Sequence, residues 1–146
     1  MNELLLIVRI AGERVALPAA AVESVVELDA VIPVPRAADH VAGLSALRSR
    51  VLTVIDCNRA LELAPRETGT IQEAAVVEWD GHHYALLVDG VDDVVEALSE
   101  ASPVRAAMGT GWERVSRGIV QTEEGALLLV DVAALIAGPD AARAAA

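Results

Sequence analysis

Histidines and a cysteine are the side chains of this sequence best suited to catalysis or metal binding. His82 and His83 are adjacent on a predicted strand, so their side chains point to opposite faces and cannot readily ligate one metal ion. His40 lies beside Asp39 in a predicted connection, and Cys57 has no sequence neighbour that would activate its thiol or complete a metal site. An enzyme that pairs Cys57 with a histidine in space stays open as an alternative.

Three aspartates form the densest acidic group, but their spacing does not match a known site. Asp89, Asp92 and Asp93 lack the alternating ligands and distal Glu of a calcium loop, so a solvated turn and helix start explains them better. The glycines are isolated, and no phosphate-binding loop, dinucleotide fingerprint or nucleophile elbow is present. The sequence therefore predicts no catalytic residue, no metal site and no cofactor.

Arg48 is the charged residue most suited to a binding role. It lies in a polar turn between two apolar runs, with Leu44 and Leu47 close by. Apolar area beside one forked, permanently charged donor is typical of interface hot spots. An exposed hairpin arginine without a partner is the alternative interpretation.

Short strands must position these residues. Apolar runs over Leu4–Ile10 and Glu13–Leu17 flank Ala11-Gly12, and Ala74–Trp79 and His82–Val88 flank Asp80-Gly81. Gly after a short polar or small residue suits the twist-compatible primed turns of two-residue hairpins. The sequence thus predicts two β-hairpins of the same design.

The chain also repeats itself. A displacement of 69 residues superposes Gly12 on Gly81 and Val25-Val26-Glu27 on Val94-Val95-Glu96, and one of 75 superposes Gly43 on Gly118 and Asp56 on Asp131. Two related halves, approximately 4–63 and 73–137, follow one another, before an Ala-rich tail over 138–146. The predicted structural turn glycines are Gly12, Gly43, Gly81, Gly90 and Gly118.

Each half reads as a hairpin, a short helical segment, a strand, a connection and a second hairpin that ends in a short helix. The expected fold is mainly β, with two SH3-like five-stranded barrels in one domain over 1–146. Barrels this small are marginal alone, so they should share an apolar seam. The helical segments are expected at Pro18–Glu23, Cys57–Leu63, Asp89–Asp93 and Val132–Ala137.

Composition excludes several function classes. The net charge of −11 repels nucleic-acid backbones and anionic lipid surfaces. One cysteine cannot form an internal disulfide, and the start of the chain lacks the pattern of a secretory signal. No apolar run approaches the roughly 20 residues that span a bilayer. We expect a cytoplasmic protein with no direct membrane insertion and no nucleic-acid partner.

At this point the residues resemble the CheW family of bacterial chemotaxis coupling proteins, over roughly Leu4 to Ile136. The stretch from Gly43 through Arg48 to Asp56 resembles the family's Asn-Leu-Arg-Gly turn and the strand that follows it. Val88–Val94 resembles its Val-Asp-Gly-Val-x-Asp-Val segment, and Gly118 with Leu127–Asp131 resembles its final hairpin. The turn departs from the pattern, because Ser49 replaces the family glycine.

The resemblance implies two SH3-like barrels and a non-enzymatic adaptor. Its partners would be the CheW-like regulatory domain of the histidine kinase CheA and the cytoplasmic tip of methyl-accepting chemoreceptors, in arrays at the inner face of the membrane. Carried over by motif, Arg48, Leu44 and Leu47 would bind the receptor, and Val22 and Ser24 the kinase. A small-ligand carrier or sensor that uses the inter-barrel groove is the alternative.

Overall fold

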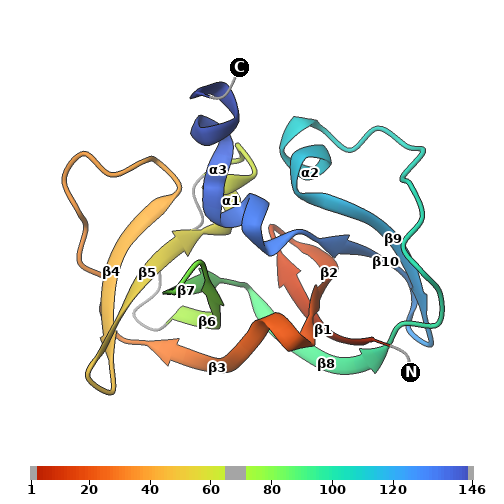
Figure 1. The fold of residues 1–146 in the computed structure, drawn as a ribbon, viewed down its shortest axis with the longest axis horizontal. Helices are drawn as coiled ribbons and strands as arrows, with labels where there is room; N and C mark the ends of the chain where they lie inside the picture. Colours follow the sequence, from red (N-terminus) through yellow and green to blue (C-terminus); the bar gives the residue numbers. More distant parts are fainter. Residues whose placement is uncertain (1–2, 65–71, 145–146) are drawn as a thin grey trace.

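Two five-stranded sheets lie side by side, and three α-helices lie together at the top of the view in Figure 1. The structure is a computed structural model that describes residues 3–64 and 72–144, and side chains as far as residue 139. Sheet A has the order β8 (Gly90–Glu96), β1 (Leu4–Ile10), β2 (Glu13–Pro18), β10 (Gly125–Val130), β9 (Ser116–Thr122). Sheet B has the order β3 (Val22–Leu28), β6 (Gln72–Trp79), β7 (His82–Leu87), β5 (Arg50–Asp56), β4 (Val41–Leu47). The helices are η1 (Ala19–Ala21), α1 (Cys57–Ala60), α2 (Thr110–Val115) and α3 (Val132–Ala144).

The two sheets do not coincide with the two halves of the sequence. Sheet A contains the first hairpin of the N-terminal half, β1–β2, and sheet B contains the first hairpin of the C-terminal half, β6–β7. Replacing each strand of sheet A by its counterpart in the sequence repeat gives the strand order of sheet B. The expectation that 4–63 and 73–137 each form their own barrel was therefore wrong. The first hairpin of each half belongs to the sheet whose other three strands come from the other half.

Parallel strand pairing attaches each of these exchanged hairpins to the second hairpin of the other half. Strand β10 runs parallel to β2, with Leu128 opposite Val15, and β5 runs parallel to β7, with Val54 opposite Ala85. Parallel strands need a long connection, so segments far apart in the sequence can form them where a tight hairpin cannot. The antiparallel pairs β1–β8 and β3–β6 join strands of different halves as well, so four strand pairings make the two halves one folding unit.

The sheets are SH3-like, but among the described residues their terminal strands do not pair into closed barrels. The segment after β3 instead crosses the outer edge of β4, where Ile32 and Leu44 exchange both backbone hydrogen bonds. The segment after β8 crosses β9 in the same way, through Ser102 and Ile119. Each sheet is thus curled, with its edge covered by the connection that precedes it.

Two of the repeated glycines make these crossings possible. Gly43 lies in β4 with φ +150°, and a Cβ there would overlap the backbone of Ile32; Gly118 lies in β9 with φ +115°, and a Cβ would meet the carbonyl of Ser102. Their prediction as turn glycines was wrong, because both lie within strands. Gly90 also begins a strand, and a Cβ there would overlap the Arg9 side chain.

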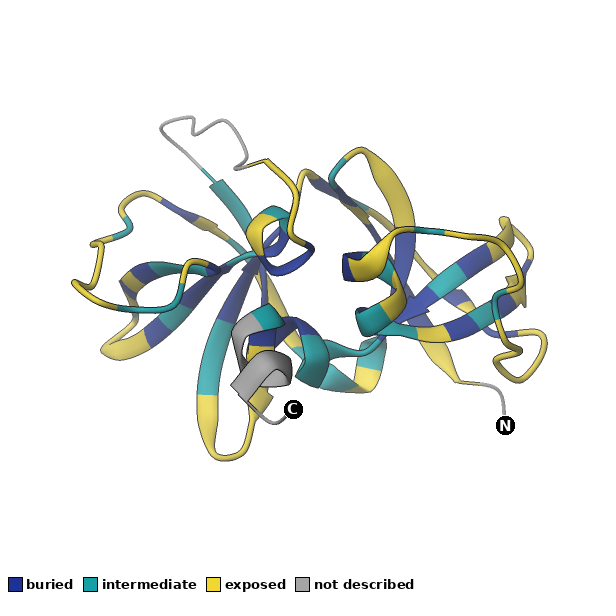
Figure 2. Cartoon of the chain, turned by 90° about the horizontal axis from the view of Figure 1, so that it is seen from above, coloured by how far each residue is buried: buried dark blue, intermediate teal, exposed yellow. Residues whose placement is uncertain are grey.

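Three clusters of buried apolar side chains form the core. One fills the interior of sheet A around Leu5 and Leu129, and one fills sheet B around Leu52 and Val54. The largest lies between the sheets and joins both hairpins to all three α-helices; its fully buried members include Val8, Ile10, Leu17, Ile55, Leu86, Val115, Val130 and Leu135. Figure 2 shows the helices from above, between the two sheets. The predicted apolar seam is confirmed as this cluster.

The helices correspond in part to the expected segments. Helix α1 begins after Asp56, whose carboxylate accepts hydrogen bonds from the backbone N–H groups of Asn58 and Arg59. Asp131 accepts one from Ala134 at the start of α3. The helical segment expected at Pro18–Glu23 is present as the short helix η1, Ala19–Ala21, whereas the one expected at Asp89–Asp93 was wrong, because β8 begins at Gly90.

Gly138 interrupts α3 and permits a close contact with the first half. Its φ of 72° breaks the helix, and a Cβ there would overlap the imidazole of His40. His40 is buried, and its Nε2 lies 2.8 Å from the carbonyl oxygen of Ile136. The helix expected over Val132–Ala137 therefore ends in a break at Gly138, after which α3 continues, and His40 ties the helix to the loop before β4.

Arg114, in α2, forms hydrogen bonds to both of the other α-helices. Its guanidinium donates hydrogen bonds to the carbonyl oxygens of Ala134 and Ala60, at a distance of 2.9 Å for Ala134. These acceptors lie in α3 and at the end of α1. One side chain therefore connects the three helices that cover the seam.

Three two-residue hairpin turns are formed by residues with positive φ, the left-handed backbone conformation. Ala11-Gly12 and Asp80-Gly81 have positive φ at both positions, which confirms the predicted primed turns. Arg48-Ser49 has φ values of 51° and 69°, so Ser49 keeps the left-handed conformation that a glycine would adopt without strain.

No helix among the described residues is long and apolar enough to cross a membrane.

Replacing Ser49 by glycine is expected to stabilise the protein by about 1 kcal/mol, because the left-handed backbone no longer carries a Cβ. Urea unfolding measures this. Ser24→Gly in β3, where φ is not positive, is the matched control and should lower the free energy of unfolding. Equal effects of the two changes would contradict a left-handed strain at Ser49.

Arg114→Ala is expected to lower the free energy of unfolding by about 2 kcal/mol, because two carbonyl oxygens lose a charged donor. Chemical denaturation checks this against Arg117→Ala, which removes an exposed arginine three residues away. A loss no larger than that of Arg117→Ala would show that the helices hold together without this contact.

Candidate partner-binding surfaces

The tip of the β4–β5 hairpin presents Arg48 to solvent. Arg48 is exposed, and among the described side chains of residues 3–64 and 72–139 its guanidinium has no ion pair or hydrogen-bond partner. The neighbouring Arg50 differs, because its Nη1 lies 3.1 Å from Oε2 of Glu23 on β3. Of the two arginines at this tip, Arg48 is the one available to a partner.

The two leucines predicted beside Arg48 lie on opposite faces of β4. Leu44 is 37% exposed, whereas Leu47 packs against the interior cluster of sheet B. The exposed apolar neighbours of Leu44 are Ile32, its partner across the edge, and Val51, which lies on the same face of the adjacent strand. We name Ile32, Leu44 and Val51 the hairpin patch; Ile32 and Val51 are 69% and 63% exposed.

Sequence reasoning missed Ile32 and Val51 as surface residues. Strand alternation signals Val51, since Leu52 and Val54 are fully buried in the sheet interior and Val51 must face away. Ile55 lies on the same face of β5 as Val51, and its side chain is buried in the seam. The hairpin patch is therefore the exposed end of the surface that the seam covers.

Strand β3 carries the other two predicted contact residues, and a bulge separates them. Val22 pairs with Val77 while Ser24 pairs with Val76, so a register shift at the intervening residue turns their side chains to opposite faces. Val22 packs partly against the seam, and Ser24 is exposed. Val25, 43% exposed, shares the face of Val22 and was missed because a bulge leaves no mark in the sequence.

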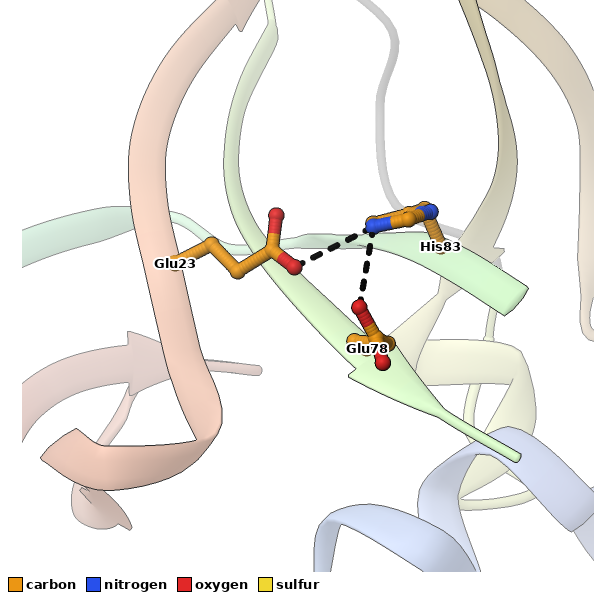
Figure 3. A group of neighbouring side chains, drawn as sticks. All are labelled: Glu23, Glu78 and His83. Atoms are coloured by element: carbon orange, nitrogen blue, oxygen red, sulfur yellow. Dashed lines mark ion pairs between the residues drawn. The ribbon is translucent and has the colours of Figure 1, made fainter. Parts of the chain in front are cut away.

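A polar cluster crosses β3, β6 and β7 beside Ser24. Nε2 of His83 lies 3.1 Å from Oε1 of Glu23 and 3.2 Å from Oε2 of Glu78 (Figure 3). The neighbouring His82 is exposed and lies on the other face of β7, as expected for adjacent strand residues. Sequence reasoning could not assemble this cluster, since no local pattern connects Glu23 with the β6–β7 hairpin.

Comparison with known proteins gives one consistent result. A family model described as the CheW-like domain matches residues 4–139. The crystal structure of the scaffolding protein TtCheW from Thermoanaerobacter tengcongensis is similar, with a TM-score of 0.75 and 21% sequence identity over 90% of this chain and 86% of that chain. No curated protein matches this chain. Since the family model covers nearly the whole of the described structure, this chain belongs to the CheW-like domain family.

Proposed function

We propose that this chain is a scaffold of bacterial chemotaxis, which couples chemoreceptors to the histidine kinase CheA without carrying out chemistry itself. The observation that carries the proposal is the CheW-like domain over residues 4–139. The similar TtCheW structure is that of a scaffolding protein. The protein would act in the cytoplasm, recruited to receptor arrays at the membrane.

Two separate surfaces on sheet B would contact the two partners. The receptor would contact Arg48 together with the hairpin patch, which combines a forked cationic donor with exposed apolar area. The kinase's regulatory domain would contact β3, a terminal strand of the sheet, near Ser24 and Val25. Val22 would support this strand from the seam, and Leu47 would support the hairpin from the sheet interior.

The curl of sheet B places these two surfaces next to each other. Arg50, two residues beyond Arg48, pairs with Glu23, the residue before Ser24. A partner that moves the hairpin tip would therefore act on β3 through this contact. Adjacent surfaces allow one partner to bias the affinity for the other, which is the thermodynamic requirement for coupling. Modest individual affinities suffice, because an array adds avidity.

The alternative of a small-ligand carrier has no observation in its favour. The expected ligand site was the groove between the barrels, and the seam there is filled by the largest cluster of buried apolar side chains. We therefore retain the scaffold as the single proposed function.

Arg48→Glu is expected to weaken binding to a receptor cytoplasmic fragment by about tenfold or more, since charge reversal removes a central donor and adds repulsion. Binding of labelled fragment to the purified protein measures this. Arg105→Glu makes the same charge change at an exposed residue outside sheet B and should bind as wild type. Equal losses in the two variants would indicate a general electrostatic effect and sink the assignment of Arg48.

Ser24→Arg is expected to weaken binding to the regulatory domain of CheA by about tenfold, because a long charged side chain enters the centre of the proposed contact. Binding to the receptor fragment should be retained. The matched control is Asp93→Arg at the equivalent position of β8 in sheet A. If Asp93→Arg abolishes kinase binding and Ser24→Arg does not, the kinase surface lies on the other sheet.

A further inference from the structure

Three metal-binding atoms lie close together, one each from Glu23, Glu78 and His83. The carboxylate oxygens and the imidazole nitrogen all lie within 4.8 Å of one another. The two distances from Nε2 of His83, 3.1 Å and 3.2 Å, are close to the edge of a tetrahedron of zinc ligands, about 3.3 Å for metal–ligand bonds of about 2.0–2.1 Å. Two of the three ligand separations thus already match a bound zinc ion, and the third, between the two carboxylate oxygens, is at most 4.8 Å.

Strand pairing fixes these three side chains. His83 and Glu78 are direct partners across β6 and β7, and the bulge in β3 brings Glu23 to the same place. Arg50 holds the other oxygen of Glu23, Oε2, at 3.1 Å, which leaves Oε1 directed at His83. Contacts that orient a metal-binding carboxylate in this way are typical of metal sites.

Nε2 of His83 cannot donate a separate hydrogen bond to each of the two carboxylates. Its Nε2 carries at most one proton, whereas two acceptor oxygens face it at nearly equal distances. A divalent cation would give all three atoms a common partner.

The equivalent positions in sheet A carry a cluster that already contains its own cationic side chains. There the repeat places Asp92 at the position of Glu23, Arg9 at that of Glu78 and Arg14 at that of His83. The Asp92 carboxylate lies 3.1 Å from Nε of Arg9 and 3.1 Å from Nε of Arg14. The same three strand positions thus carry two permanent cations around one acid in sheet A, and two acids around a metal-binding imidazole in sheet B.

We propose that Glu23, Glu78 and His83 form a binding site for a zinc ion that ties β3 to the β6–β7 hairpin. One imidazole and two carboxylates suit Zn²⁺, whereas Mg²⁺ and Ca²⁺ prefer oxygen ligands alone. The side chains are 22–55% exposed, so water can complete the coordination. The site adds to the proposed scaffold function without resting on it, and it departs from the expectation, drawn from the sequence, of no metal ligands.

Calorimetric titration of the full chain with zinc chloride tests this, after treatment with a chelator and removal of any histidine tag. We expect one zinc ion per chain, with affinity reduced about tenfold or more in His83→Gln, Glu23→Gln and Glu78→Gln. His82→Gln, which removes the adjacent exposed histidine, should bind as wild type. Melting temperatures without metal establish that each variant is folded, and the His83 ring signals in NMR should shift on zinc addition.

Two outcomes would overturn the proposal. Heat no larger than in a magnesium titration would show that the cluster is an ion pair and not a metal site. Equal zinc affinity in wild type and His83→Gln would show an adventitious ion on surface carboxylates only.

Discussion

The parallel pairing of β2 with β10 and of β5 with β7 is the interaction on which the rest of the structure depends. Each pairing attaches the first hairpin of one half of the sequence to the second hairpin of the other half, whose remaining strand, β8 or β3, pairs with the same first hairpin on its other side. Neither sheet is complete without both halves, and the seam between the sheets is lined by the two exchanged hairpins. A half of about 60 residues buries too little surface to be stable alone, so the exchange makes one folding unit of two marginal ones.

Local chemistry allowed part of this fold to be predicted. Asp80-Gly81 and Ala11-Gly12 specify primed turns whose geometry is set within two residues, and both hairpins were found for that reason. The repeated Gly43 and Gly118 indicated two related halves, although the cause was a backbone crossing and not a turn. The exchange itself could not be predicted, because parallel pairing joins distant segments and leaves no local pattern. Helix α2 was missed, and β8 was mistaken for a helix because of its aspartates.

The surfaces show the same division between local and distant information. Arg48 was identified from its place in a turn, and the structure has it exposed at a hairpin tip. The faces of Leu47 and Val22 depend on how a curled sheet closes over its core, and these two side chains pack inward in part. The cluster of Glu23, Glu78 and His83 depends on a bulge and on the pairing of β3 with β6, neither of which a sequence pattern reveals.

The hairpin exchange also has an evolutionary consequence. Two halves that complete each other's sheets around a shared seam have the topology of a domain-swapped homodimer whose subunits were fused into one chain. In a homodimer both copies of every surface must mutate together, whereas in a fused chain each copy changes alone. Two clusters illustrate that freedom: the same three strand positions carry Asp92 with two arginines in sheet A, and His83 with two glutamates in sheet B. Fusion of a symmetric ancestor thus gives one small protein two dissimilar faces, which a symmetric dimer cannot have.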